Sequence, residues 1–252
     1  MEPAYRLLSA ATLRHRAQQR LSVYPPVFLP LARLRYRNLD NRVVSAGTEL
    51  VIEGFPRSGN TFAVTAFDMA QDRPVRVVHH LHSAAQVMEA VRVGIPTILL
   101  VREPADCTLS RALRTPRISV RQALGDWVRF HERVIPLLEG IVVADFSIAT
   151  SDFGAVIRRV NERFGTDFRE FEHTQENVSE CFERITKGNL EQFGGLVEMA
   201  IARPSTERDE AKRRLRAEFE SERLARLRLR AASLYRTIAS ASVEIPSAGH
   251  EP

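Results

Sequence analysis

The chain has 252 residues and a formal net charge of +5 at pH 7. Hydrophobic residues make up 44% and charged residues 27%, which is typical of a soluble globular protein, and no segment approaches the roughly 18 apolar residues of a membrane-spanning helix. The positive charge suits an anionic ligand, an anionic surface or nucleic acid. Because the sequence offers no nucleic-acid-reading module and no aromatics interleaved with its basic residues, we expect no nucleic-acid partner.

The two cysteines, Cys107 and Cys181, lack the spacing of metal ligands. The N-terminus lacks the combination of basic flank, apolar stretch and cleavage site that marks a secretory signal. Both features predict a cytoplasmic protein. At this length we expect a single domain over residues 1–252, while the oligomeric state stays open.

The first segment, residues 1–45, is rich in arginine and leucine. Three prolines interrupt "VYPPVFLPLARLRYRN", so we expect at most a short basic helix followed by an irregular segment. We interpret this basic N-terminal arm as a cover over the scaffold. The alternative is a basic amphipathic helix on a membrane surface, for which "YRLLSAATLRHRAQQRLSVY" has loosely helical leucine spacing.

Residues 46–170 alternate short apolar runs with helical patterns and form the expected nucleotide-binding core. The apolar runs are "ELVIEGF", "VRVVHH", "PTILLVRE" and "GIVVADF". Such alternation is typical of a parallel sheet covered by helices. We therefore predict an α/β fold with a P-loop-like parallel sheet of about four to five strands flanked by helices, followed by a helical C-terminal region.

Local signals mark several helix boundaries in this core. Ser83 with Gln86 has the spacing of a capping box, and Gly94 is placed to end the same helix. A further helix is expected over residues 120–138. The pattern "DFGAVIRRVNERFG" predicts another helix, which Gly165 closes.

The last third of the chain carries helical patterns and no strand pattern. Residues 171–240 form the expected helical region, with one long helix over 206–235. Its narrow apolar stripe consists of Leu224, Leu227, Ala231 and Leu234. Residues 241–252 lack periodicity and are expected to form a mobile tail.

The stretch "VIEGFPRSGNTFA" leads an apolar run into Gly54, then Gly59, then Thr61. A strand, a glycine-rich turn and a helix place backbone N–H groups and the positive helix end around an anion, which predicts a phosphate-binding loop. The lysine of GxxxxGK[ST] is missing, because Asn60 takes its place and Arg57 is the cation of the loop. The alternative is an ordinary strand-to-helix turn that contains two glycines.

A second motif, "TILLVREPADCTLSRAL", follows the third expected strand. Ligands of open parallel sheets gather at the carboxyl ends of the strands, so Arg102 should lie beside the loop. Pro104 can begin a helix, which places Ser110 about two turns into it. An arginine fork and a hydroxyl can hold one more phosphate. The alternative is a surface salt bridge for Arg102 and an inert helical serine.

Together, "FPRSGNTF" and "LLVREPADCTLSRAL" resemble the sulfotransferases that use 3′-phosphoadenosine 5′-phosphosulfate, especially the bacterial branch whose loop reads PRSG followed by threonine. The match covers residues 49–170. The resemblance implies that the first loop binds the 5′-phosphosulfate through Arg57, Ser58, Gly59, Asn60 and Thr61. It implies that the 3′-phosphate is held by Arg102 and Ser110. A nucleotide without β and γ phosphates needs no loop lysine.

The sequence departs from the family pattern in three places. Asn60 stands where a threonine is common, "ADF" replaces an aromatic-acid pair, and the C-terminal "RKG" element is missing. We interpret "ARPSTERDEAK", with Arg203, Ser205 and Arg208, as a source of adenosine-side contacts. The alternative is a helix cap at Ser205 or Thr206.

The resemblance implies an enzyme that transfers a sulfuryl group to an acceptor hydroxyl by in-line displacement and requires no metal. Arg57 would stabilise charge on the departing phosphate oxygen. The acceptor needs a base, and "VVHHLHS" offers His80, which precedes a leucine as the family's catalytic histidine does. Strand alternation places His79 and His80 on opposite faces. His82 and Glu103 are the alternative bases.

Two other function classes stay open. A nucleotide-dependent kinase would bind a triphosphate with Mg²⁺, and Asp145 follows an apolar strand as such a site requires. A degenerate, non-catalytic nucleotide-binding protein is the other. The acceptor is a small molecule, carbohydrate or lipid, and the basic arm is a candidate for peripheral membrane contact.

Overall fold

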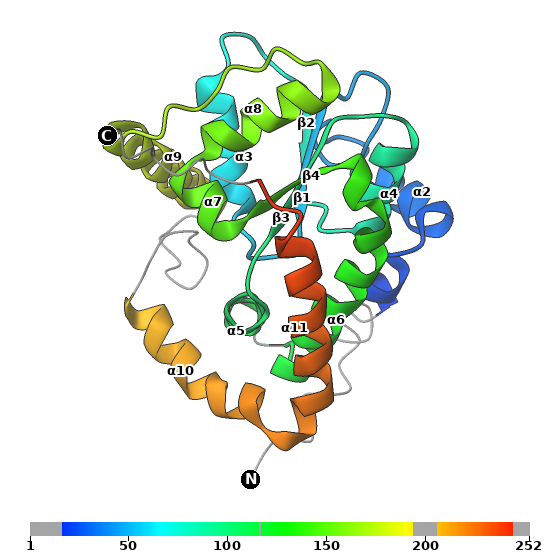
Figure 1. Ribbon diagram of the computed structural model, residues 1–252, viewed down its shortest axis with the longest axis vertical. Coiled ribbons are helices and arrows are strands. Elements are labelled where there is room, and N and C mark those ends of the chain that lie inside the picture. Colours follow the sequence, from blue (N-terminus) through cyan, green and yellow to red (C-terminus); the bar gives the residue numbers. More distant parts are fainter. Residues whose placement is uncertain (1–16, 116, 194–205, 244–252) are drawn as a thin grey trace, which may run out of the picture.

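The computed structural model describes residues 17–115, 117–193 and 206–243. Four strands form one parallel sheet in the order β2-β1-β3-β4. They are β1 (Leu50–Gly54), β2 (Val77–His79), β3 (Thr97–Val101) and β4 (Val142–Asp145). Helices flank this sheet on both sides (Figure 1). The predicted α/β fold is therefore confirmed, with four strands among the described residues.

Alternate residues of the strands face two separate hydrophobic clusters. Leu50, Ile52 and Leu100 belong to one cluster, whereas Leu99 and Val101 belong to the other. The first cluster is completed by helices α3 (Asn60–Ala70), α8 (Phe153–Phe164) and α9 (Gln175–Phe193). The second is completed by helices α4 (Ala84–Arg92), α5 (Pro104–Arg114), α6 (Val120–Val134) and α11 (Ala225–Ala239). Because both faces are covered, the strands are mostly apolar, as is typical of parallel sheets. Glu53 in β1 and Thr97 in β3 are buried polar exceptions.

Most of the predicted helix boundaries are confirmed. Pro104 is the first residue of α5, where the missing N–H costs no helical hydrogen bond. Gly94 follows α4 with φ +73°, and Gly165 caps α8 with φ +66°, both in the left-handed region that favours glycine. The helix expected over 120–138 is α6, followed by a 3₁₀ turn over Ile135–Gly140.

The predicted capping box at the start of α4 is wrong. Ser83 is the N-cap residue, but its hydroxyl donates to the carbonyl of Ser22 at 2.7 Å instead of accepting from the helix. The Gln86 amide points away from the cap and donates to the carbonyl of Arg42 and to the Glu53 carboxylate. Both side chains form hydrogen bonds with residues distant in the sequence instead of forming the local capping box.

The N-terminal arm is more helical than predicted. Helix α2 (Pro25–Arg35) runs through the proline-rich segment and packs on α4. Its first two positions hold Pro25 and Pro26, where no N–H donor is needed. Pro30 lies inside the helix, and burial of Phe28 and Leu29 compensates for the hydrogen bond that it removes.

The prediction of one long helix over 206–235 is also wrong, because the helix is interrupted near Ser221. Helix α10 (Thr206–Glu220) ends there, a 3₁₀ turn (Glu222–Leu224) follows, and α11 then packs on α6. The predicted apolar stripe is buried in part, at Leu224, Ala231 and Leu234.

The predicted mobile tail is partly wrong at its start. Just after α11, Val243 donates its N–H to the carbonyl of Val143, so residues 241–243 lie against β4 instead of forming a tail. The rest of the expected tail lies outside the described residues. The short helix α7 (Phe146–Ser151) links β4 to α8. None of the helices in the described ranges is long and apolar enough to cross a membrane.

Candidate functional site

The phosphate-loop candidate connects β1 to α3 at the carboxyl end of the sheet, where ligands of such folds gather. Two of its residues have positive φ: Arg57 at 81° and Gly59 at 97°. Positive φ is rare for a side chain such as arginine, so the surrounding contacts must hold this conformation. Gly59 caps α3 in the left-handed region. The loop is therefore tightly constrained.

Arg57 joins the two sequence motifs. Its Nε donates to the hydroxyl of Ser110 at 2.9 Å, and Ser110 lies on α5, two turns from Arg102. Arg102 in turn donates from Nη1 to the backbone carbonyl of Arg57 at 3.3 Å. The three residues that the sequence assigned to two phosphates thus lie together at the ends of β1 and β3. Ser110 contacts Arg57, whereas the family resemblance predicts that it acts together with Arg102.

The Arg102 guanidinium is held on several sides. It lies 4.0 Å from the ring centroid of Phe146 and 3.4 Å from the Asp106 carboxylate. Its Nε is buried and has no hydrogen-bond partner within the described part of the chain. The predicted alternative, a salt bridge, is therefore present, but in a partly buried, aromatic setting.

Two further loop residues are buried. The Ser58 hydroxyl lies 3.5 Å from the Cys107 sulfur, inside the fold. Asn60 occupies the position of the missing lysine and is 4% exposed. Neither its amide nitrogen nor its amide oxygen has a hydrogen-bond partner among the described residues. Because unpaired buried polar atoms cost about 1–3 kcal/mol, a polar ligand at this loop would relieve a real penalty.

A chain of polar side chains leads from the loop to the histidines. Thr61 Oγ1 lies 3.2 Å from His80 Nε2, and His80 Nδ1 lies 2.6 Å from His79 Nδ1. His79 Nε2 lies 3.3 Å from the amide nitrogen of Asn41, in the N-terminal arm. The arm therefore contributes to the site, which sequence reasoning missed because nothing local marks Asn41.

The expectation that His79 and His80 point to opposite faces is wrong. Strand β2 ends at His79, and His80 has φ +59° instead of an extended conformation. His82 also has positive φ, at 53°. Alternation therefore no longer applies, and the rings of His79 and His80 meet edge to face with centroids 4.7 Å apart.

Burial keeps these rings neutral. It lowers the pKa of His79 to about 4 and lowers the pKa of His80 well below its usual 6.5. Each neutral ring carries one N–H. With the Asn41 amide donating to His79 Nε2, the His79 proton sits on Nδ1 and is donated to His80 Nδ1. His80 then donates from Nε2 to Thr61, whose own proton stays available for a ligand oxygen.

Glu53, in the middle of the buried strand β1, fixes the turn that carries the histidines. Its carboxylate accepts from the backbone N–H of Leu81 at 2.7 Å and of His82 at 3.0 Å, and from the Gln86 amide. Burial raises the pKa of Glu53 to about 7, and these hydrogen bonds oppose the rise. In the sequence, the position of Glu53 inside the apolar run "ELVIEGF" is the signal that could have identified this residue.

The other candidate residues are engaged elsewhere. His82 Nδ1 lies 2.9 Å from the Gly54 carbonyl, and the Glu103 carboxylate accepts from the Asp106 N–H as the cap of α5. The Asp145 carboxylate accepts from Ser147 at the start of α7 and from the Tyr235 hydroxyl at 2.6 Å.

The proposed adenosine-side residues are not placed by the structure. Arg203 and Ser205 lie outside the described residues, and so does the side chain of Arg208 in α10. Their role stays a prediction.

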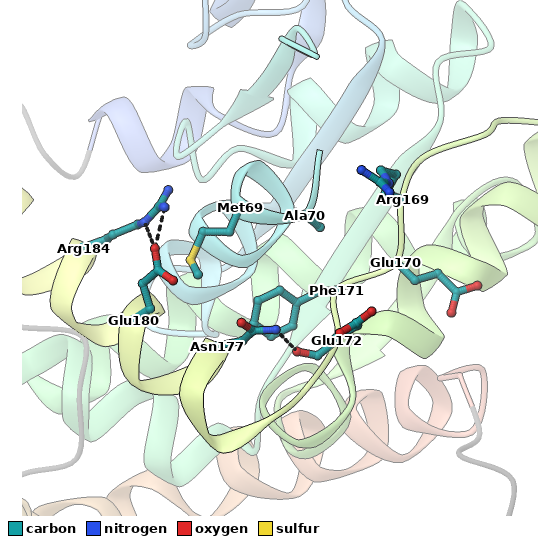
Figure 2. A pocket seen from close by; sticks show the side chains of 9 residues that line it. All are labelled: Met69, Ala70, Arg169, Glu170, Phe171, Glu172, Asn177, Glu180 and Arg184. Atoms are coloured by element: carbon teal, nitrogen blue, oxygen red, sulfur yellow. Dashed lines mark hydrogen bonds and ion pairs between the residues drawn. The ribbon is translucent and has the colours of Figure 1, made fainter. Parts of the chain in front are cut away.

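A cavity of about 310 Å³ lies away from the loop. Figure 2 shows it beside Met69 and Ala70, the last two residues of α3, whereas the loop precedes the first residue of that helix. It is open and polar, and an ion pair between Glu180 and Arg184 lies at its rim. It therefore does not belong to the phosphate-loop site.

The chain matches no protein-family model and no curated protein. Among solved structures, one that it resembles is the mouse sulfotransferase SULT7A1 complexed with PAP. The alignment has a TM-score of 0.40 and 10% sequence identity, and it covers 81% of this chain and 94% of that chain.

Proposed function

We propose that the protein is a sulfotransferase that transfers the sulfuryl group of 3′-phosphoadenosine 5′-phosphosulfate to an acceptor hydroxyl. The observation that carries the proposal is the hydrogen bond at 2.9 Å between Arg57 and Ser110, which brings two separate phosphate motifs into one lysine-free site. An isolated strand-to-helix turn would have no reason to meet the second motif in this way.

The donor nucleotide would bind across the two motifs. Backbone N–H groups at the start of α3 and the side chains of Arg57, Ser58, Asn60 and Thr61 would hold the 5′-phosphosulfate, with Gly59 allowing close approach. Arg102 and Ser110 would hold the 3′-phosphate. Asn60 supports this assignment, because its buried amide nitrogen and oxygen have no hydrogen-bond partner in the described part of the chain.

In the reaction, the acceptor oxygen would form a bond to sulfur while the bond from sulfur to the 5′-phosphate oxygen breaks. The leaving group is 3′,5′-adenosine bisphosphate. Arg57 would stabilise the charge that develops on the departing oxygen. His80 would take the acceptor proton, and burial favours its neutral form at pH 7, as a base requires.

The base role needs an unprotonated His80 Nε2, whereas the arrangement in the structure protonates that atom. Rotation of the Asn41 amide by half a turn would present its oxygen to His79 Nε2 and reverse both shared protons. His80 Nε2 would then be free to accept a proton from the substrate hydroxyl. Asn41 and His79 would thus be positioning residues for His80.

The kinase alternative has less support. Asp145 serves as a helix cap and as the acceptor for Tyr235, and the lysine position holds a buried asparagine. The degenerate binding protein has less support because Arg57, Arg102 and Ser110 are all present and close together.

Calorimetric titration tests the proposal without knowledge of the acceptor. The full chain is titrated with 3′,5′-adenosine bisphosphate and, separately, with ATP and Mg²⁺, in buffer free of phosphate and sulfate. Binding of the bisphosphate with little response to ATP supports the donor site and justifies an acceptor screen. Preference for ATP with Mg²⁺ would replace the proposal by the kinase, and no binding of either would favour the degenerate protein.

A further inference from the structure

The outward face of helix α2 is apolar. Val27, Leu31 and Leu34 recur at helical spacing and are 49%, 53% and 68% exposed. Tyr24, just before the helix, is 51% exposed. Figure 1 shows α2 at the outer edge of the molecule, beyond α4. A stripe of large apolar side chains on one exposed helix face commonly marks an interaction site.

The opposite face of the same helix is also apolar. Phe28, Leu29 and Ala32 are buried against Leu81 and other residues of the adjoining cluster. An ordinary surface helix presents polar residues to water once its inner face is packed. Helix α2 therefore carries a second apolar face that the core does not use.

Helix α2 and the residues directly before and after it carry positive charge, and the neighbouring acidic groups are Glu89 on α4 and Asp40. Residues 17–39 contain four arginines and no aspartate or glutamate. Arg20, Arg35 and Arg37 are exposed, and Arg33 is half-exposed and pairs with Glu89. Apolar side chains flanked by arginines match the boundary of an anionic membrane, where the former enter the acyl region and the latter meet headgroup phosphates.

We propose that the outward face of α2 docks on a membrane surface that contains anionic phospholipid. A second copy of the chain is a poorer occupant, because a symmetric contact would bring the two sets of arginines together. The site differs from the membrane helix considered from the sequence, which begins among residues outside the described ranges. It rests on exposure and charge, and not on the proposed function.

Docking would orient the phosphate-loop site. Leu81 packs with the inner face of α2 and lies between His80 and His82. The histidine turn would therefore lie roughly one helix diameter, about 10 Å, from the lipid. That arrangement fits an acceptor presented at a membrane surface.

Vesicle co-sedimentation of the full chain tests the docking surface. The probes are vesicles of phosphatidylcholine alone and of phosphatidylcholine with phosphatidylserine. We expect the wild type to bind the anionic vesicles. The affinity for these vesicles should fall by about tenfold or more in Leu31→Glu/Leu34→Glu. It should fall by about fivefold for each arginine that is replaced in Arg35→Gln/Arg37→Gln. Leu229→Glu is the matched control, because Leu229 lies on α11 and is 73% exposed. This variant should bind the vesicles as the wild type does.

Three outcomes would overturn the proposal. One is no binding of the wild type to anionic vesicles. Another is equal binding by Leu31→Glu/Leu34→Glu and wild type, which would assign the affinity to basic residues elsewhere. The third is a lipid-free dimer that Leu31→Glu/Leu34→Glu abolishes, measured by light scattering, which would make the occupant a second copy. Circular dichroism of each variant checks that the fold is retained.

Discussion

The Arg102 side chain joins several parts of the candidate site. It contacts the Arg57 carbonyl, the Phe146 ring and the Asp106 carboxylate, and it is 18% exposed. A guanidinium held in this way is positioned for a phosphate before any ligand arrives, so little conformational entropy is lost on binding. The same side chain contributes little to the hydrophobic clusters.

Arg102→Ala should therefore weaken binding of 3′,5′-adenosine bisphosphate and leave the fold intact. Loss of charge-assisted hydrogen bonds costs about 1.5–3 kcal/mol, or roughly 10–100-fold in affinity. Titration calorimetry measures the effect. Arg169→Ala is the control, since Arg169 is exposed and pairs with Asp72 away from the loop. Unchanged affinity in Arg102→Ala would remove this residue from the site.

The hydrogen bonds that link Asn41, His79, His80 and Thr61 give a second prediction, about which ring nitrogen of each histidine carries the proton. Asn41→Asp replaces a group that can donate by one that only accepts. His79 should then carry its proton on Nε2, and His80 should carry its proton on Nδ1. Long-range ¹H–¹⁵N NMR of the histidine rings distinguishes the two tautomers without any substrate.

Asn38→Asp controls for the added negative charge, because Asn38 is exposed and lies three residues earlier in the arm. It should leave both tautomers unchanged. If the His80 proton stays on Nε2 in Asn41→Asp, the amide does not set the tautomer and Asn41 loses its positioning role.

At the scale of elements, the sequence predicts best what local chemistry determines. The four apolar runs are strands, Pro104 begins a helix, and Gly165 ends one. Each of these features depends on residues within one turn or one strand. The position of Arg102 next to Arg57 follows from the carboxyl-end rule for parallel sheets.

Features set by distant contacts were not predictable. Helix α2 forms despite Pro30 because Phe28 and Leu29 bury side chains against other elements. The left-handed conformation of His80 accompanies hydrogen bonds from the following backbone to Glu53, which is 27 residues earlier in the chain. Nothing in "VVHHLHS" alone encodes that contact.

The close approach of β1 to β3 gives a prediction at this scale. A Cβ on Gly54 would lie 2.4 Å from the carbonyl oxygen of Leu100, so Gly54→Ala must push the two strands apart. We expect a loss of about 1–3 kcal/mol in the free energy of unfolding. Urea denaturation followed by circular dichroism measures it.

Gly188→Ala is the matched control, because a Cβ at Gly188 meets nothing within 4 Å in helix α9. The same change there should stabilise the protein by up to about 1 kcal/mol through helix propensity. Equal effects of the two substitutions would show that the approach of the strands is not what requires Gly54.

For the whole molecule, buried ionisable groups determine how stability depends on pH. Burial lowers the pKa of His82 to about 4 and of His131 to about 3, in addition to its effect on His79 and His80. Between pH 6.5 and about pH 4, the unfolded chain binds protons at these sites and the folded chain does not, so stability falls as pH falls. Glu53 acts in the opposite direction, since its raised pKa stabilises the fold as pH falls from about 7 to 4.5.

Burial also lowers the pKa of His173 and raises the pKa of Asp68, so five histidines oppose two carboxyls. We therefore expect a net loss of stability as pH falls from 6.5 to about 4.5. Each histidine contributes up to about 1.4 kcal/mol per pH unit. His131→Phe should remove one such contribution, because His131 is buried against Trp127 and Phe130 and lies outside the Asn41 to Thr61 chain. Urea denaturation of both proteins across this range measures the two slopes. Equal slopes for the two proteins would mean that burial does not keep His131 neutral. A wild-type stability that does not change with pH would contradict the expected net loss.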